Sequence, residues 1–111
     1  MIFYETASGR SPVREYLDRL SAAEAAKVLT DLDLLAAFGL ELGMPHVRPV
    51  QGKVWELRSV GRVQHRVLYA AVSGRRLVLL HAFTKKTPKT PASEIDLAEH
   101  RFADYQARYG R

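Results

Sequence analysis

Arginine and lysine side chains are concentrated in one segment of this 111-residue chain. Between His46 and Pro91 a single acid, Glu56, accompanies ten cations, whereas the other seven cations and eleven acids lie outside the segment. The ten are Arg48, Lys53, Arg58, Arg62, Arg66, Arg75, Arg76, Lys85, Lys86 and Lys89. Arginine binds phosphate through bidentate hydrogen bonds, and lysine binds it as a point charge. The segment is therefore expected to meet a polyanion such as nucleic acid, or an acidic protein.

Side chains of these types could also cleave RNA without a metal ion or a protein nucleophile. The 2′-OH of RNA attacks the adjacent phosphate, and the protein orients the strand, moves protons and stabilises the developing charge. A lysine crowded by other cations is driven toward its neutral form, and histidine titrates nearest neutrality, so either could transfer a proton. The predicted catalytic set is Arg66 as a phosphate clamp, with Arg58, Lys85, Lys86 and His81, and the predicted RNA contacts are Lys53, Arg62 and Lys89.

Several of these residues could instead have a purely structural or solvent-exposed role. Lys85 and Lys86 could be a solvated run, and His81 could be a packed, hydrogen-bonded side chain. The base among these three residues stays open. The positive charge as a whole could serve solubility alone.

Other chemistries find little support in the sequence. The histidines at positions 46, 65, 81 and 100 lack the helical pairing or nearby carboxylates of a metal site. The chain has no glycine-rich phosphate loop and no serine in a nucleophile-elbow context. We therefore expect neither a metal nor another cofactor.

Length and composition predict one soluble domain over residues 1–111. The chain has a mass of 12.5 kDa and an isoelectric point near 9.8. It contains no cysteine, which fits a reducing cytoplasm. Neither a secretory signal nor a membrane-spanning run of apolar residues is expected, so we predict a cytoplasmic protein without membrane contact.

Two helices are predicted ahead of the cationic segment. Ser11-Pro12 is typical of a helix start, and apolar residues follow at helical spacing as far as Leu20. Ser21 and Glu24 have the spacing of a capping box before a second helix, which runs to about Leu42 and ends at Gly43-Met44-Pro45. The apolar stripe of this second helix consists of Ala25, Val28, Leu29, Leu32, Leu35, Ala36 and Gly39, with Leu34 and Phe38 off the stripe. Those last two could pack on the first helix or form a partner surface.

The cationic segment itself predicts an antiparallel meander. Residues 53–60, 62–72 and 76–84 alternate or are rich in β-forming residues, and turn signals separate them. In the first strand Trp55 and Leu57 point one way, whereas Glu56 and Arg58 point the other. A further short strand is predicted over residues 2–6, at an edge or inserted. Thr90-Pro91 predicts the start of a C-terminal helix, whose stripe is Ile95, Ala98, Phe102, Tyr105 and Tyr109 and which Gly110 ends.

The turn residues allow the registers of the two hairpins to be estimated. A two-residue loop at Ser73-Gly74 places Arg66 opposite His81, and directly opposed residues share a face. A three-residue loop at residues 60–62 brings Arg58 and Arg66 to one side, whereas a two-residue loop leaves Arg58 on the far face. We favour the longer loop because it clusters the cations. A slip of one residue would reverse that conclusion.

These elements give an α+β fold, and several of their residues resemble a known family. Two helices and an N-terminal strand precede the three-stranded antiparallel meander, and one C-terminal helix follows it. Residues 55–58 (WELR), residues 66–69 (RVLY) and above all residues 79–91 (LLHAFTKKTPKTP) are similar to HigB-type toxins of bacterial type II toxin–antitoxin systems. These toxins belong to the RelE/ParE superfamily and include phage-derived relatives.

The resemblance implies a RelE-like fold and a ribosome-dependent mRNA interferase. It also implies neutralisation by a cognate antitoxin, often a small helix-turn-helix protein, with operator DNA reached only through that antitoxin. Arg58, Arg66 and the Lys85-Lys86 pair match the functional cations of the family. The loop at Gly61 looks shorter than is usual in the family. Two alternatives stand beside this interpretation: a ParE-like toxin that poisons DNA gyrase without catalysis, and a non-catalytic RNA-binding regulator.

Overall fold

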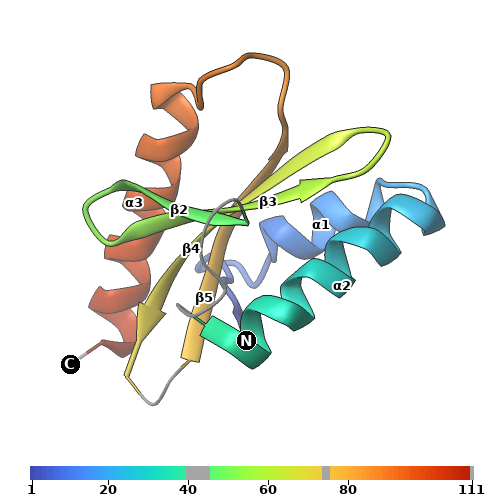
Figure 1. The fold of residues 1–111 in the computed structure, drawn as a ribbon. Helices are drawn as coiled ribbons and strands as arrows, with labels where there is room; N and C mark the ends of the chain where they lie inside the picture. Colours follow the sequence, from blue (N-terminus) through green and yellow to red (C-terminus); the bar gives the residue numbers. More distant parts are fainter. Residues whose placement is uncertain (40–45, 74–75, 111) are drawn as a thin grey trace.

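The computed structural model describes residues 1–39, 46–73 and 76–110. Within these ranges five strands form one sheet, with α1 and α2 on one face and α3 on the other (Figure 1). The strands are β1 (Ile2–Phe3), β2 (Val47–Gln51), β3 (Val54–Val60), β4 (Gln64–Val72) and β5 (Arg76–Thr84), and the helices are α1 (Pro12–Asp18), α2 (Ala22–Phe38) and α3 (Ala92–Tyr109). The α+β prediction is confirmed, and the arrangement is consistent with a RelE-like fold.

The sheet contains one more strand than the sequence predicted. Its order is β1-β5-β4-β3-β2, with β1 parallel to β5 and the other neighbours antiparallel. β1 lies at an edge and is shorter than the predicted 2–6 segment. The unpredicted strand, β2, contains Pro49, which cannot donate a hydrogen bond to a sheet ladder. It is tolerated because β2 is the opposite edge strand.

At Arg66 both hairpin registers differ from the estimates by two residues. Arg66 lies opposite Phe83, not His81, because the β4–β5 connection pairs Val72 with Arg76 and a bulge between Leu68 and Tyr69 adds a second offset. In the other hairpin Val60 pairs with Gln64, so the loop comprises residues 61–63 and not 60–62. A shift of two preserves the face on which each side chain lies, because side chains alternate with period two. The prediction that Arg58 and Arg66 share a face is therefore confirmed, and they are direct partners.

Two of the predicted helix starts differ in detail. Ser11 is the N-cap of α1 with Pro12 after it, but the Ser11 side chain makes no capping hydrogen bond. The N-cap of α3 is Pro91, one residue later than predicted. Thr90, the predicted cap, instead contacts Glu56 and Arg48. The capping box of α2 is confirmed, since the Ser21 hydroxyl accepts from the Glu24 amide.

Helix α2 ends at Phe38, earlier than predicted, and Gly39 follows with a positive φ of 56°. The predicted stop at residues 43–45 lies outside the described residues. Only the centre of the predicted stripe is buried, at positions 28, 32 and 35, while Leu29 and Ala36 are exposed. Leu34 and Phe38 are 40% and 52% exposed, so they do not pack into the core.

The sheet separates two apolar cores. One lies under α1 and α2 and includes Leu32, Leu57 and Tyr69. The other lies under α3 and includes Leu68 and Phe102. β4 contributes side chains to both cores, so residues 65–70 are buried whichever way they point. His65 and Arg66 of β4 are therefore both removed from water, one on each face of the sheet.

Candidate active site

Cationic side chains from three neighbouring strands face the same side of the sheet as α3. Arg48 on β2 is the Cα partner of Glu56 on β3, and Arg58 on β3 is the partner of Arg66 on β4. Directly opposed residues share a face, and side chains two apart on one strand share it as well. Lys85 follows directly after β5. We call Arg48, Glu56, Arg58, Arg66 and Lys85 the Glu56 cluster.

Glu56 is the fully buried acid at the centre of this cluster. Its Oε1 accepts a hydrogen bond of 2.9 Å from Arg48 Nε and lies 3.6 Å from Arg66 Nε. Its Oε2 accepts a hydrogen bond from the Thr90 hydroxyl, which itself accepts one from Arg48 Nη2 at 3.2 Å. One carboxylate thus joins β2, β3, β4 and the segment before α3. It is the single acid of the cluster, which contains four cations.

Arg66 is completely covered in this structure, with an exposed fraction of 0%. Its Nη1 donates to the His65 carbonyl at 3.2 Å and its Nη2 to Gln64 Oε1 at 3.1 Å, while its Nε has no hydrogen-bond partner. Burial lowers the pKa of Arg66, Glu56 opposes that shift, and Arg58 and Arg48 add to it. The structure shows the guanidinium covered by its neighbours, and its role as a phosphate clamp stays a prediction.

Lys85 is the partly exposed amine of the cluster. Its backbone N–H donates to the Gln64 carbonyl at 2.8 Å, which fixes the chain as it leaves β5. Desolvation lowers the pKa of Lys85 most, and repulsion from Arg66 and Arg58 lowers it further, against the opposing effect of Glu56. The neutral amine, which can accept a proton, is therefore more accessible in Lys85 than in an ordinary surface lysine.

His81 lies on the same face but is engaged by α3. Its Nδ1 accepts from Arg101 Nη1 at 3.2 Å, so its Nε2 carries the proton and donates to Glu94 Oε1 at 2.7 Å. Its ring stacks on Phe83 with a centroid distance of 5.6 Å. Burial lowers the pKa of His81, although Glu94 opposes the shift. The structure therefore shows the packed, hydrogen-bonded arrangement that was one of the two interpretations.

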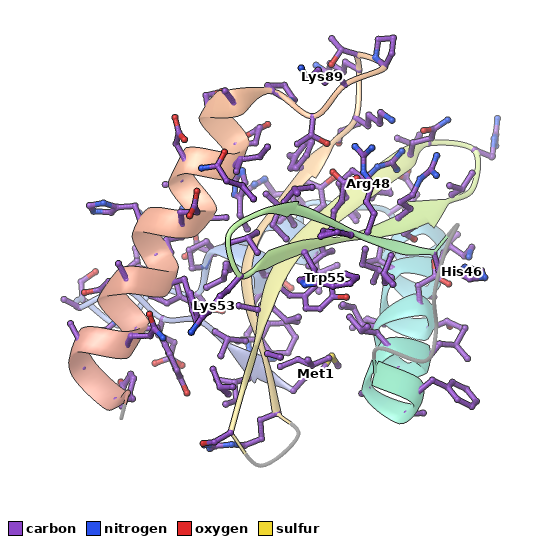
Figure 2. The ribbon with its side chains drawn as sticks, turned by 60° about the vertical axis from the view of Figure 1, so that its left-hand side comes forward. Met1, His46, Arg48, Lys53, Trp55 and Lys89 are labelled. Atoms are coloured by element: carbon purple, nitrogen blue, oxygen red, sulfur yellow. The ribbon has the colours of Figure 1, made fainter. Side chains whose placement is uncertain are left out.

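The other predicted site residues are distributed more widely. Lys86 and Lys89 are exposed in the segment between β5 and α3, at the top of Figure 2. Lys53 lies at the β2–β3 turn, at the opposite end of that hairpin from Arg48 (Figure 2). Arg62 lies in the β3–β4 loop, where it borders a pocket of about 430 Å³ together with residues of α2. Lys53 and Arg62 are thus not part of the Glu56 cluster.

Sequence reasoning missed three members of the site. Arg48 was counted among the cations but given no role, Glu56 was assigned only a face, and Thr90 was read as a helix cap. The available signal was Glu56 itself, a lone acid in a strand whose neighbours are cationic. An isolated carboxylate in such a segment is expected to pair with the arginines around it.

In the described part of the chain, no group of three or more histidine, aspartate or glutamate side chains could hold a metal ion. No helix within those same ranges has the length and apolar character needed to cross a membrane.

One family of known proteins is similar to this chain over most of its length. The family model described as phage-derived protein Gp49-like (DUF891) matches residues 15–103. No curated protein matches the chain. The matched range begins inside α1 and ends inside α3, so it contains the whole Glu56 cluster.

Proposed function

Because the chain belongs to the family of phage-derived Gp49-like proteins (DUF891), a RelE/HigB-like toxin family, we propose that it is the toxin of a type II toxin–antitoxin system and cleaves mRNA on the ribosome. The observation that carries the proposal is the Glu56 cluster, in which four cations surround one buried carboxylate. The excess positive charge suits a phosphate, and the depressed pKa of Lys85 suits a general base. The protein acts in the cytoplasm, where mRNA and ribosomes are found.

The proposed reaction is an internal transesterification. The neutral amine of Lys85 takes the proton of the 2′-OH, and the 2′ oxygen forms a bond to the adjacent phosphorus. The bond from phosphorus to the 5′ oxygen breaks, and that oxygen receives a proton from Lys86, the exposed ammonium next in the chain. The products are a 2′,3′-cyclic phosphate and a 5′-OH end, and neither a metal ion nor a cofactor is consumed.

The arginines stabilise the charge that develops during this step. Arg58 contacts the phosphate, because it is only half-buried and lies directly opposite the fully buried Arg66 of β4. Arg66 contributes positive potential from beneath, where low polarity makes its charge act more strongly than in water, and the partly exposed Arg48 adds a second charge. Glu56 holds both arginines in place while cancelling only part of their charge. His81 supports the N-terminal turn of α3 through Glu94 and does not enter the proton transfer.

We further propose that a cognate antitoxin neutralises the protein. The antitoxin is a small protein with a helix-turn-helix domain, and operator DNA is bound only through it. The net charge of +5 favours an acidic partner segment. Co-expression with the product of the neighbouring gene tests this point, since the two proteins should co-purify and growth should resume.

The decisive experiment maps transcript ends after induction and measures supercoiling by purified DNA gyrase in parallel. The proposal expects new 5′-OH ends within translated mRNAs and unchanged supercoiling activity. New ends that disappear when translation is blocked would establish the need for the ribosome. Intact transcripts with inhibited gyrase would replace the proposal with a ParE-like one, and intact transcripts with active gyrase would leave a non-catalytic RNA-binding regulator.

A further inference from the structure

A second group of cations and aromatic rings lies at the other end of α3, away from the Glu56 cluster. Two hollows of about 320 Å³ and 380 Å³ flank the last turn of this helix, and both are bordered by Arg76, Tyr105 and Tyr109. Lys53, from the β2–β3 turn, borders the larger one. We call Lys53, Arg76, Tyr105 and Tyr109 the Tyr109 groove.

The groove has two aromatic rings, one exposed and one buried beside it. Tyr109 is 63% exposed, whereas Tyr105 beside it is buried. Their ring centroids lie 5.1 Å apart with planes tilted by 46°, and the guanidinium carbon of Arg108 lies 5.3 Å from the Tyr109 centroid. Arg108 is itself held by Asp104, one turn earlier in α3. The Tyr109 ring is thus braced by neighbouring side chains while much of its surface remains open to solvent.

The charged residues at the larger hollow have one sign, whereas Glu5 borders the smaller hollow. Among the described residues that border the larger hollow, Lys53 and Arg76 are cationic and none is acidic. Both side chains belong to exposed residues. Arg76 is fixed by a hydrogen bond of 3.1 Å from its Nε to the Ser73 carbonyl. Two cations beside an exposed aromatic ring match the two repeating parts of a single-stranded nucleic acid, its phosphates and its bases.

We propose that the Tyr109 groove is a second binding site for single-stranded nucleic acid. A base stacks on the ring of Tyr109, and the flanking phosphates lie against Lys53 and Arg76. Stacking on an aromatic ring accepts any base, so the site adds affinity without sequence preference. An acidic peptide would use the two cations but would have no comparable need for the ring, which is why the ring decides the test.

The position of the groove also bears on the length of the bound strand, and this extension rests on the proposed ribonuclease function. His81 and Glu94 mark the end of α3 that lies near the Glu56 cluster, and Tyr109 is the last residue of this 18-residue helix. Such a helix is about 27 Å long. At about 3.4 Å per nucleotide, the rise of a stacked strand, roughly eight nucleotides reach from one site to the other. A substrate of that length would be held at both ends of α3.

The test uses oligodeoxythymidylates of about four and about sixteen nucleotides, lengths below and above that span. They lack the 2′-OH and cannot be cleaved, so binding is measured apart from activity. Tyr109→Ala should weaken binding of the longer probe about tenfold, whereas Tyr109→Phe, which keeps the ring, should bind like the parent protein. The double variant Lys53→Ala/Arg76→Ala should reduce the slope of log affinity against log salt by about 1.4. Lys27→Ala, an exposed lysine of α2 far from the groove in sequence, removes one surface charge as a control and should lower that slope by much less.

Each outcome decides the proposal. Unchanged binding by Tyr109→Ala would overturn it, as would equal losses in the alanine and phenylalanine variants, because the hydroxyl and not the ring would then matter. Weakening by the cation variant alone would indicate a site for acidic groups in general and would also overturn it. Circular dichroism checks that the variants are folded. A failure of the ribonuclease proposal would appear in transcript cleavage and would leave these binding results unaffected.

Discussion

His65 and Arg66 are consecutive residues of β4, both almost fully buried, yet they occupy opposite kinds of environment. His65 faces α1 and α2, where its Nε2 pairs with Glu24 Oε1 at 2.9 Å and its Nδ1 lies within hydrogen-bonding distance of the Tyr16 hydroxyl. That hydroxyl also meets Thr84 Oγ1 at 2.8 Å. Every polar atom of the imidazole therefore has a partner, and the chain of contacts ties α1 and α2 to the sheet.

Arg66 faces the other side and is much less well satisfied. Its Nε lacks a hydrogen-bond partner, the nearest carboxylate is shared with Arg48, and further cations crowd it. Buried polar groups in proteins are usually fully paired, so an excess of unbalanced charge at one place is a feature of sites that bind or react. Burial alone therefore does not separate a structural residue from a functional one. The two are separated by how fully the hydrogen bonds and charges of the buried side chain are paired.

The largest expected effect is a loss of cleavage activity when a residue of the Glu56 cluster is changed. Lys85→Ala removes the proposed base and should lower the cleavage rate by about 10²- to 10⁴-fold, because general base catalysis contributes that much. Lys27→Ala, an exposed lysine of α2 on the other face of the sheet, is the control and should retain most of the rate. The measurement is the yield of new transcript ends together with growth after induction. If the Lys85 variant arrested growth as strongly as the parent protein, the Glu56 cluster would have no part in the mechanism.

The next prediction compares the stability of variants on the face of the sheet that carries Arg66. Arg66→Ala removes one partner of a buried carboxylate, and we expect a loss of about 3–5 kcal/mol in the free energy of unfolding, measured in urea. Growth arrest should be relieved as well. Arg58→Ala is the control: Arg58 is only half-buried, so the free energy of unfolding should change by much less while growth arrest is still relieved. If Arg66→Ala relieved growth arrest and Arg58→Ala did not, unfolding and not the loss of catalysis would explain the relief.

The His65 side should show the reverse pattern. His65→Leu leaves Glu24 and Tyr16 without their shared partner, and we expect a loss of about 1–3 kcal/mol in the free energy of unfolding. The variant should still arrest growth at a temperature where it remains folded, since the Glu56 cluster is intact. Tyr16→Phe keeps the ring in the core and should cost less. A folded His65 variant without toxicity would contradict the division between the two faces.

The sequence predicts the local features of this molecule well and its long-range contacts poorly. Alternation in β3 correctly separated Trp55 from Arg58, because side-chain direction in a strand depends only on position. The registers were off by two, since loop length and a bulge cannot be counted from turn residues alone. Thr90 was read as a helix cap because that signal is local. Its actual partner, Glu56, lies 34 positions earlier in the chain and is found only in the fold.

A smaller effect is expected from His81, which burial keeps below its usual pKa. The unfolded chain then binds a proton near pH 6.5 that the folded protein takes up only at lower pH. The free energy of unfolding should therefore be greatest above about pH 6.5 and should decrease as the pH falls through the folded value. Glu94 opposes this loss and Arg101 adds to it. His81→Gln should flatten the profile between about pH 5 and 7, measured by urea unfolding, and an unchanged slope would assign it to other groups.

The smallest and most specific effect is a shift in the pH profile of cleavage. Arg58 is one of the cations that lower the pKa of Lys85, so Arg58→Ala should raise that pKa. The base form of Lys85 then appears at higher pH, and the rising limb of the residual cleavage rate should move to higher pH by on the order of one unit or less. Arg62→Ala, in the β3–β4 loop outside the cluster, should leave the limb in place. Equal shifts in both variants would show that net charge, and not the geometry around Glu56, sets the basicity of Lys85.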